Sequence, residues 1–241
     1  MLRLRKPSRP DVTPSPNIWY WPDVYEVENR AQDCSGAVWR VLREQCDWSG
    51  RDVVDIGCGT GFHLPLFAAT ARSVVGVEPH PELAERARKR LDGTPGVDVR
   101  VASAQRLPLP DASVDLVHAR TAYFFGPGCE PGLAEAERVL RPGGAIAIVD
   151  LDTARSPYGD WMRADAPHID PVEIESFFDR QGFRSLPVDT LWRFHRREDL
   201  EAVFGIEFTE RTARRAARET PGLTVPVGYR VRIRRKTLVG R

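Results

Sequence analysis

The segment 53–62, with the sequence VVDIGCGTGF, constrains the fold of this chain more than any other. It begins with a short apolar run rich in β-branched residues, which is typical of a buried parallel strand. Glycines follow at positions 57, 59 and 61. Because glycine lacks a Cβ atom, such a turn lets the backbone approach a ligand closely. The segment therefore predicts a ligand site at the carboxyl end of a first strand.

The same alternation of short apolar runs and amphipathic segments continues along the chain. Expected helices cover residues 36–46, 62–70, 81–91 and 131–140, and expected strands cover residues 53–56, 73–77, 97–101, 114–118 and 145–151. Strands that alternate with helices in this way predict an α/β protein with a doubly wound, largely parallel sheet and helices on both faces.

The pattern changes after residue 152. The sequence predicts a loop over residues 153–170 and a helix over 171–181. It predicts a strand over 184–194 and one charged helix over 196–218. Residues 223–236 predict a late strand, with Val231 and Ile233 on one face and arginines on a polar face. No linker separates a second domain. We therefore expect a flexible arm over 1–17 and one domain over 18–241, with a cofactor-binding core at 36–151 and substrate-side elements at 18–35 and 152–218.

Composition excludes several classes of protein. The 241 residues carry 35 Lys and Arg against 34 Asp and Glu, a formal net charge of +1, which argues against holding nucleic acid by bulk charge. There is no apolar run of about 18 residues and no apolar stretch in the basic N-terminus, so neither a membrane span nor a secretory signal is expected. Four scattered cysteines without a Cys-x-x-Cys pair predict a cytoplasmic protein without a metal site.

Spacing within the glycine turn indicates which ligand it suits. A dinucleotide fingerprint needs glycine at position 62, where this chain has Phe62, and a phosphate-binding loop needs a Gly-Lys-Ser/Thr ending that is absent. Asp55 precedes the turn, which suits a ligand without a phosphate. Glu78 ends the second strand about 20 residues later, where a carboxylate accepts hydrogen bonds from ribose hydroxyls. The alternative is that Glu78 is only a solvated residue leaving a strand.

These features together resemble the class I S-adenosylmethionine-dependent methyltransferases. The matching blocks run in the family's order over about residues 45–151: DIGCGTG at 55–61, Glu78, AQRLPLPD at 104–111, VDLV at 114–117 and EAERVLRPGG at 135–144. The resemblance implies a Rossmann-like sheet of seven strands with one antiparallel strand, for which residues 223–236 are the candidate. It implies S-adenosylmethionine as the cofactor.

The resemblance also implies roles for individual residues. The methionine part of the cofactor would lie on Asp55, Gly57, Cys58, Gly59 and Gly61. The ribose would bind Glu78, and the adenine would contact Pro79, Ser103, Ala104 and Gln105. One departure concerns Ser103, where the family often has an acidic residue, so the adenine contact rests on a hydroxyl that Gln105 could supplement.

Methyl transfer from a sulfonium needs alignment and charge stabilisation, and a base only if the acceptor loses a proton. Three candidates follow the fourth strand. His118 is either a general base that also borders the cofactor, or a strand-end histidine bonded to backbone. Arg120 would hold an acidic substrate or the cofactor carboxylate. Tyr123 is expected mainly as a wall of the pocket.

Two regions outside the matching blocks leave alternatives open. The aromatic residues at 19–25 form either a lid over the cofactor or simple packing of the first helix. Residues 211–241 hold ten basic residues against Glu219 alone, either a nucleic-acid face or a solvated surface. The predicted function is methylation of a small-molecule acceptor. The alternatives are an RNA or protein substrate, or a protein that senses or uses the cofactor without methylation.

Overall fold

A seven-stranded sheet forms the centre of the computed structural model, which describes residue 12 and residues 14–238. The strand order is β3-β2-β1-β4-β5-β7-β6. Strand β7 alone runs opposite to the other six strands. This confirms the predicted fold class and the antiparallel strand. The bounds are β1 (Asp52–Ile56), β2 (Ser73–Val77), β3 (Val97–Arg100), β4 (Val114–Arg120), β5 (Leu140–Leu151), β6 (Arg184–Arg193) and β7 (Thr224–Arg235).

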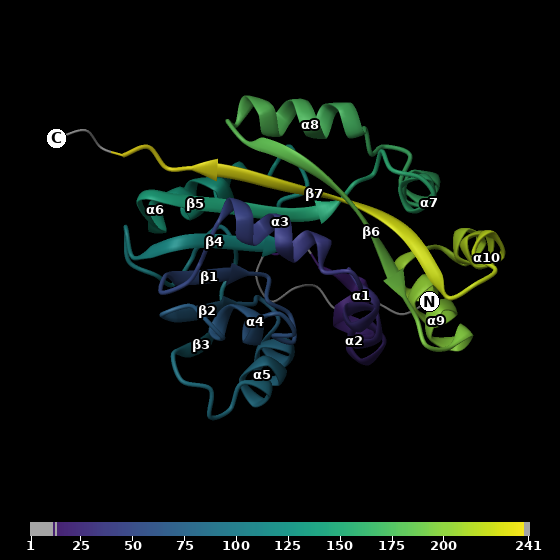
Figure 1. The fold of residues 1–241 in the computed structure, drawn as a ribbon, viewed down its shortest axis with the longest axis horizontal. Helices are drawn as coiled ribbons and strands as arrows, with labels where there is room; N and C mark the ends of the chain where they lie inside the picture. The colour runs from purple at the N-terminus through teal and green to yellow at the C-terminus, as the bar shows by residue number, and fades with distance from the viewer. Residues whose placement is uncertain (1–11, 13, 239–241) are drawn as a thin grey trace.

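Helices cover both faces of this sheet, as Figure 1 shows. No helix within the described part of the chain is both long and apolar enough to cross a membrane. The bounds are α1 (Pro16–Tyr20), α2 (Pro22–Ala31), α3 (Ala37–Gln45), α4 (Leu64–Ala68), α5 (Pro81–Arg90), α6 (Glu130–Val139), α7 (Tyr158–Asp165), α8 (Pro171–Arg180), α9 (Arg197–Glu207) and α10 (Glu210–Glu219).

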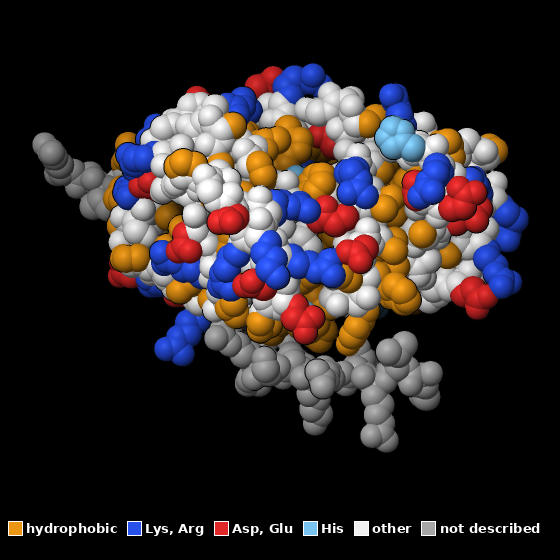
Figure 2. Space-filling model, turned by 90° about the horizontal axis from the view of Figure 1, so that it is seen from below, with side chains coloured by type: hydrophobic (Ala, Val, Ile, Leu, Met, Phe, Trp, Pro, Cys, Tyr) orange, Lys and Arg blue, Asp and Glu red, His pale blue; other side chains and the backbone are white. Residues whose placement is uncertain are grey.

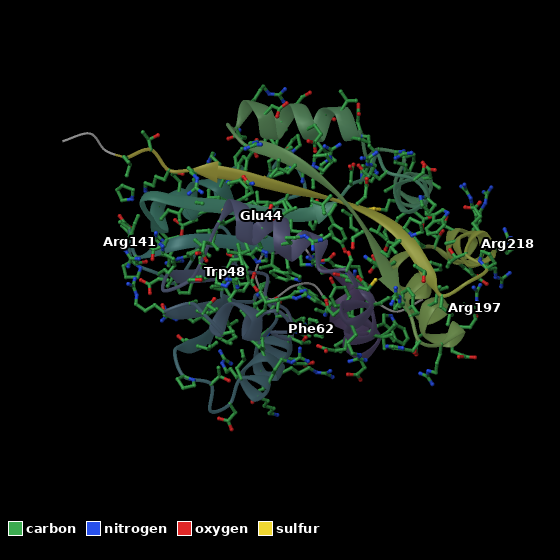
Figure 3. All side chains as sticks on the ribbon, viewed as in Figure 1. Glu44, Trp48, Phe62, Arg141, Arg197 and Arg218 are labelled. Carbon is green, nitrogen blue, oxygen red and sulfur yellow. The ribbon has the colours of Figure 1, made fainter. Side chains whose placement is uncertain are left out.

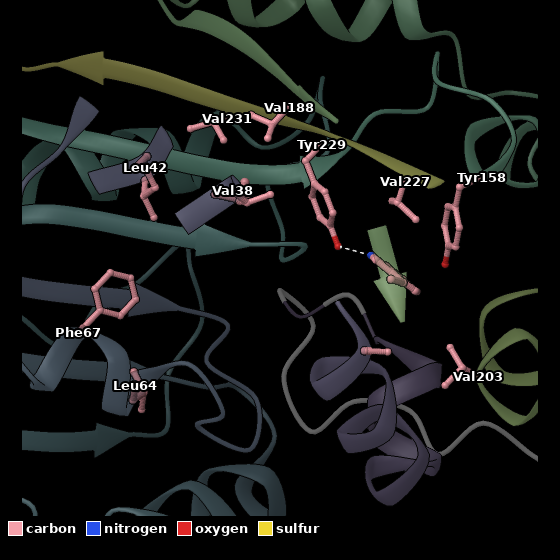
Figure 4. Close-up of a cluster of buried hydrophobic side chains, with 14 of the residues drawn as sticks. Val38, Leu42, Leu64, Phe67, Tyr158, Val188, Val203, Val227, Tyr229 and Val231 are labelled. Carbon is pink, nitrogen blue, oxygen red and sulfur yellow. Dashed lines mark hydrogen bonds between the residues drawn. The ribbon is translucent and has the colours of Figure 1, made fainter. Parts of the chain in front are cut away.

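Two apolar clusters lie on opposite faces of the sheet because side chains alternate along each strand. Val53 of β1 belongs to the cluster that includes residues of α3, α4, α7, α9 and α10, and the adjacent Val54 belongs to the cluster beneath α6 and α8. The first cluster extends from Leu42 to Tyr229, whose hydroxyl accepts a hydrogen bond from the Trp192 indole at 2.9 Å (Figure 4). The two clusters together hold the strands whose ends carry the loops of the site.

Two expected elements of the C-terminal part differ in the structure. The stretch predicted as a loop at 153–170 contains α7, whose Tyr158 and Trp161 are buried three residues apart. The single helix expected over 196–218 is two helices, because Phe208 adopts an extended backbone conformation between α9 and α10. Asp165 accepts hydrogen bonds from Thr209 and Thr212 at the start of α10. The break thus depends on a partner distant in sequence.

The predicted arm at 1–17 falls largely outside the described residues. Its last two residues, Pro16 and Asn17, already belong to α1. The Asn17 side chain donates a hydrogen bond of 2.6 Å to Glu207 at the end of α9. Helix α1 is therefore tied to an element almost 200 residues away, which the local composition did not indicate.

The arginine face of β7 is largely covered, with Arg232 buried and Arg230 and Arg234 partly buried, which corrects the expectation of a solvated polar face. Arg232 is 2% exposed and its guanidinium lies 4.5 Å from the ring centre of Phe178 in α8. It also forms an ion pair with Glu175 of the same helix. Arg234 pairs with Glu137 at 3.2 Å and stacks on Phe183. Arg232 and Arg234 thus each pair with an acidic residue of a neighbouring helix, Glu175 of α8 and Glu137 of α6.

Replacing Arg232 by alanine is expected to lower the free energy of unfolding by about 3 kcal/mol, because it removes the ion pair with Glu175 and opens space over Phe178. Urea denaturation measures this change. The control is Arg211→Ala on the exposed side of α10, which should change stability by less than about 0.5 kcal/mol. Equal effects of the two substitutions would contradict the structural role of Arg232.

Candidate functional site

A cavity of about 650 Å³ opens at the carboxyl ends of β1, β2 and β4. The chain passes from β1 to β2 on one side and returns to β4 on the other, so these ends meet where the strand order reverses. Such a crevice is the general binding place of open α/β sheets. Its walls also include α1, α2 and the end of α9, which no prediction from strand order alone would place there.

The glycine turn after β1 forms the floor of the cavity. Gly57 and Gly59 have φ angles of +73° and +55°, a conformation that residues with a Cβ rarely adopt. A Cβ at Gly57 would lie 2.5 Å from the Cβ of Ala122, and one at Gly59 would lie 2.7 Å from the Ile18 side chain of α1. The turn is thus held between the loop after β4 and the N-terminal helix, with its backbone facing the cavity.

Glu78 lies at the end of β2 as predicted and lines the cavity. Its two carboxylate oxygens accept hydrogen bonds from the backbone N–H groups of Gly59 at 3.0 Å and His80 at 2.9 Å. Burial raises the pKa of this carboxyl to about 7, against the two backbone hydrogen bonds, which lower it. Each oxygen keeps a further lone pair, so the group suits the two neighbouring hydroxyls of a ribose.

The residues predicted for the adenine lie together at one end of the cavity. They are Pro79, Ser103, Ala104 and Gln105. Trp19 of α1 contacts His80 there, with ring centres 4.7 Å apart. Cys58 lines the floor, and burial raises the pKa of its thiol well above the usual value, so it stays a neutral thiol. This end combines flat apolar surface with hydrogen-bonding groups, which suits a purine.

Asp55, His118 and Gly61 do not line the cavity, although all three were predicted for the site. His118 is 1% exposed, and its Nδ1 lies 2.7 Å from Oδ1 of Asp55, its register partner across β1 and β4. The imidazole packs against Phe67, with ring centres 4.9 Å apart. The pair lies behind the cavity wall, where it holds the two strand ends together and cannot reach a bound acceptor.

Gly61 instead allows the glycine turn to pack closely against α5. A Cβ on this residue would lie 3.0 Å from the Cβ of Ala87 in α5. The absence of a side chain therefore lets α5 approach the glycine turn and close the bottom of the site.

The two other candidates after β4 do line the cavity. Arg120 is 8% exposed and donates two hydrogen bonds to Oε1 of Gln32, the shorter at 2.9 Å. Tyr123 packs against α6, where a Cβ on Gly132 would meet its ring at 2.2 Å. Its pKa is raised, mainly by burial, which disfavours a role as a proton acceptor. Tyr123 therefore forms part of the cavity wall, as expected.

The N-terminal helices lie across the cavity. Helix α2 is bound to α5 by ion pairs from Asp23 to Arg86 at 2.6 Å and from Glu26 to Arg90 at 2.8 Å. The Glu26 carboxylate also accepts a hydrogen bond from Thr60 of the glycine turn. Figure 3 shows Phe62 between the β1–β3 half of the molecule and these helices. The position agrees with the lid hypothesis, whose opening and closing stay a prediction.

The sequence interpretation missed two acidic residues near the cavity, one buried and one partly buried. Glu28 of α2 is 2% exposed, and Glu207 of α9 lines the cavity. Glu207 follows the buried Val203 and Phe204 by four and three residues. A carboxylate on the apolar face of a helix was therefore the available signal.

Comparisons with known proteins agree with this geometry. A family model described as a methyltransferase domain matches residues 54–148. The chain is 31% identical over 203 residues to the ubiquinone/menaquinone biosynthesis C-methyltransferase UbiE of Rubrivivax gelatinosus, covering 77% of this chain and 78% of the relative. It is 38% identical over 130 residues to 27-O-demethylrifamycin SV methyltransferase of Amycolatopsis mediterranei, covering 52% of this chain and only 46% of the relative.

Solved structures share the fold at low sequence identity. The [4+2]-cyclase SpnF superposes with a TM-score of 0.58 and 20% identity, covering 87% of this chain and 85% of that chain. At this identity the likeness concerns the fold alone. The name of that protein also shows that the fold is compatible with a reaction other than methylation.

Proposed function

The chain belongs to the S-adenosylmethionine-dependent methyltransferases, and from this we propose that it methylates a small-molecule acceptor bound beside the cofactor in the cavity. The observation that carries the proposal is the enclosure of the site by α1, α2 and α9. Its volume of about 650 Å³ is in the range of small-molecule sites. The names of two relatives refer to small molecules, one to ubiquinone/menaquinone biosynthesis and one to 27-O-demethylrifamycin SV.

The residues of the cavity divide between the parts of the cofactor. Glu78 would hold the ribose, the Pro79 and Ala104 end would hold the adenine, and the backbone of Gly57 and Gly59 would face the methionine part. When bound, the cofactor supplies an activated methyl group on a sulfonium. The protein orients that group towards the acceptor and excludes water, which the N-terminal helices achieve by covering the turn.

The distribution of positive charge argues against an RNA or protein substrate. The basic residues of 211–218 lie on α10, whereas Arg230, Arg232 and Arg234 lie under α8 and pair with acidic residues. Arg218 and Arg197 lie at the opposite end of the molecule from Arg141 (Figure 3). On the face seen in Figure 2, basic and acidic side chains are interspersed. No single basic surface among the described residues leads to the cavity.

Calorimetry and product analysis test the proposal. We expect S-adenosylmethionine and S-adenosylhomocysteine to bind at one site, and turnover with an acceptor to release S-adenosylhomocysteine. Mass spectrometry distinguishes this product from methylthioadenosine, which a different use of the cofactor would release. Absence of binding, or methylthioadenosine as the main product, would refute the proposal.

A further inference from the structure

Glu28 and Glu207 form a carboxyl pair that the binding of the cofactor does not use. They come from α2 and α9, which pack against each other, and their carboxyl groups lie close enough to interact. Glu207 lines the cavity, whereas Glu28 is 2% exposed and lies behind it. Two ionised carboxylates both lack a donor, so a hydrogen bond between them needs one shared proton.

The surroundings of the pair show where the proton resides. Oε1 of Glu207 accepts from Asn17 at 2.6 Å, and its Oε2 lies 3.5 Å from the Tyr158 hydroxyl. Oε1 of Glu28 accepts from Gln32 at 2.8 Å, but its Oε2 has no donor or acceptor among the described residues apart from the pair itself. Glu207 therefore suits the carboxylate, and Glu28 the protonated acid that donates to it.

The charges facing the pair support a single shared proton. The titratable groups that interact with it are Tyr25 of α2, Arg120 of β4, Tyr158 of α7 and Tyr229 of β7. Of these, Arg120 is the cation. One negative charge on the pair balances it, and a second would be buried without a partner. Burial, followed by the repulsion from Glu207, raises the pKa of Glu28 well above its usual value, and burial raises the pKa of Glu207.

We infer that Glu207 accepts the proton of a hydroxyl group on the acceptor during methyl transfer, and that Glu28 positions Glu207 by donating its own proton to it. This inference rests on the proposed function and names the class of its substrate, an apolar molecule that bears a hydroxyl. Glu207 is the catalytic residue because it borders the cavity, and Glu28 is a positioning residue.

The cavity favours a hydroxyl over an amine. Arg120 and Glu207 both line it, and Nη1 of Arg120 has no hydrogen-bond partner among the described residues. A hydroxyl oxygen accepts from a guanidinium and donates to a carboxylate at the same time. An ammonium group only donates, and it would face the Arg120 charge. The apolar walls formed by Ile18, Phe62 and Ile206 suit the remainder of such an acceptor.

The step conserves atoms and electrons. The hydroxyl oxygen forms a bond to the methyl carbon while the carbon–sulfur bond breaks, and the electron pair of that bond stays on sulfur. The hydroxyl proton passes to the Glu207 carboxylate, and then to solvent after the ether has left. No further oxidant, reductant or metal ion takes part.

Kinetics with matched acceptors test the inference. We use 1-naphthol and 1-naphthylmethylamine, which share a ring system, the amine being an ammonium ion at the assay pH, and follow S-adenosylhomocysteine release. Methylation of the naphthol, with kcat reduced at least about 100-fold in Glu207→Gln, is expected. Glu28→Gln should stay within about tenfold of the unmodified protein, because its amide still donates to Glu207. No transfer to the naphthol, equal transfer to the amine, or a Glu207→Gln variant with unchanged kcat overturns the inference.

The pH profile and an infrared spectrum provide readouts that a structural role would not move. The acidic limb of kcat for the naphthol should disappear in Glu207→Gln and persist in Glu28→Gln. At pH 8, the spectrum of the unmodified protein minus that of Glu28→Gln should contain one band of a protonated carboxyl group. If the acidic limb of kcat persists in both variants, or if the carboxyl band is absent, the inference is overturned.

Binding of S-adenosylhomocysteine separates the inference from the proposed function. Glu207→Gln should bind this ligand within about twofold of the unmodified protein, since Glu207 contacts neither its ribose nor its adenine. A protein that binds the ligand and fails the preceding tests refutes the role of Glu207 alone. A protein that does not bind it refutes the proposed function. Arg120→Gln adds a check: a large loss of affinity would assign Arg120 to the cofactor carboxylate and overturn its role at the hydroxyl.

Discussion

Replacing Gly57 by alanine is expected to weaken S-adenosylmethionine binding more than about 100-fold and to lower the free energy of unfolding by about 3 kcal/mol. The φ angle of +73° costs an alanine about 1–2 kcal/mol. The new Cβ would also lie 2.5 Å from the Cβ of Ala122, which is fixed to the backbone after β4 and cannot rotate away. Relief of this overlap must move the turn that faces the cofactor. Calorimetry and urea denaturation measure the two effects.

Gly93→Ala is the matched control for this substitution. Gly93 has a φ angle of +75°, but a Cβ there would meet no atom within 4 Å. The control therefore contains the backbone strain without the overlap, and it lies outside the cavity. It should lose about 1–2 kcal/mol of stability and bind the cofactor normally. Normal binding by Gly57→Ala as well would show that the turn does not contact the ligand.

Replacing Glu78 by glutamine is expected to weaken S-adenosylmethionine binding by about 100-fold or more. The carboxylate accepts from two backbone N–H groups and would accept from two ribose hydroxyls, and each charge-assisted hydrogen bond contributes about 1.5–3 kcal/mol. The amide nitrogen of glutamine would instead point a donor at the N–H of Gly59 or His80. Glu82→Gln, on the exposed side of α5, should leave the affinity unchanged. Equal affinities of the two variants would contradict the ribose role.

The affinity of the unmodified protein should also depend on pH through Glu78. Because the pKa of Glu78 is about 7, its ionised carboxylate prevails above pH 7 and its protonated carboxyl prevails below pH 7. If only the carboxylate binds ribose well, affinity falls as the pH decreases, by a slope that approaches about tenfold per unit. Calorimetry between pH 6 and 8.5 should show this slope, and Glu78→Gln should lack it. A slope that persists in the variant would assign the titration to another group.

The sequence was most informative where local pattern and chemistry coincide. The apolar run at β1, the three glycines and Glu78 are close in sequence, and their backbone requirements are local. The parallel strands up to β5 followed from apolar runs that few other elements can accommodate. The antiparallel strand was predicted by the family resemblance, and its pairing with β5 and β6 confirms it.

The incorrect expectations concern residues whose partners are distant. The helix expected over 196–218 is interrupted because Asp165 binds the start of α10, which no window around residue 208 contains. The arginines of β7 alternate with apolar residues as an exposed face would, yet α8 covers them and supplies Glu175 and Phe178. His118 has the residue type of a base but lies behind the wall, bonded to Asp55.

The sequence by itself determined the doubly wound core and the cofactor and predicted the ribose carboxylate, because each depends on residue types at short, fixed spacings. Only the tertiary structure decided which groups meet at the proposed acceptor site. Glu28, Arg120 and Glu207 are separated by about ninety residues at each step, and their meeting depends on how α2 and α9 pack across the end of β4. The charge balance that we assign to them exists only after that packing removes water from all three.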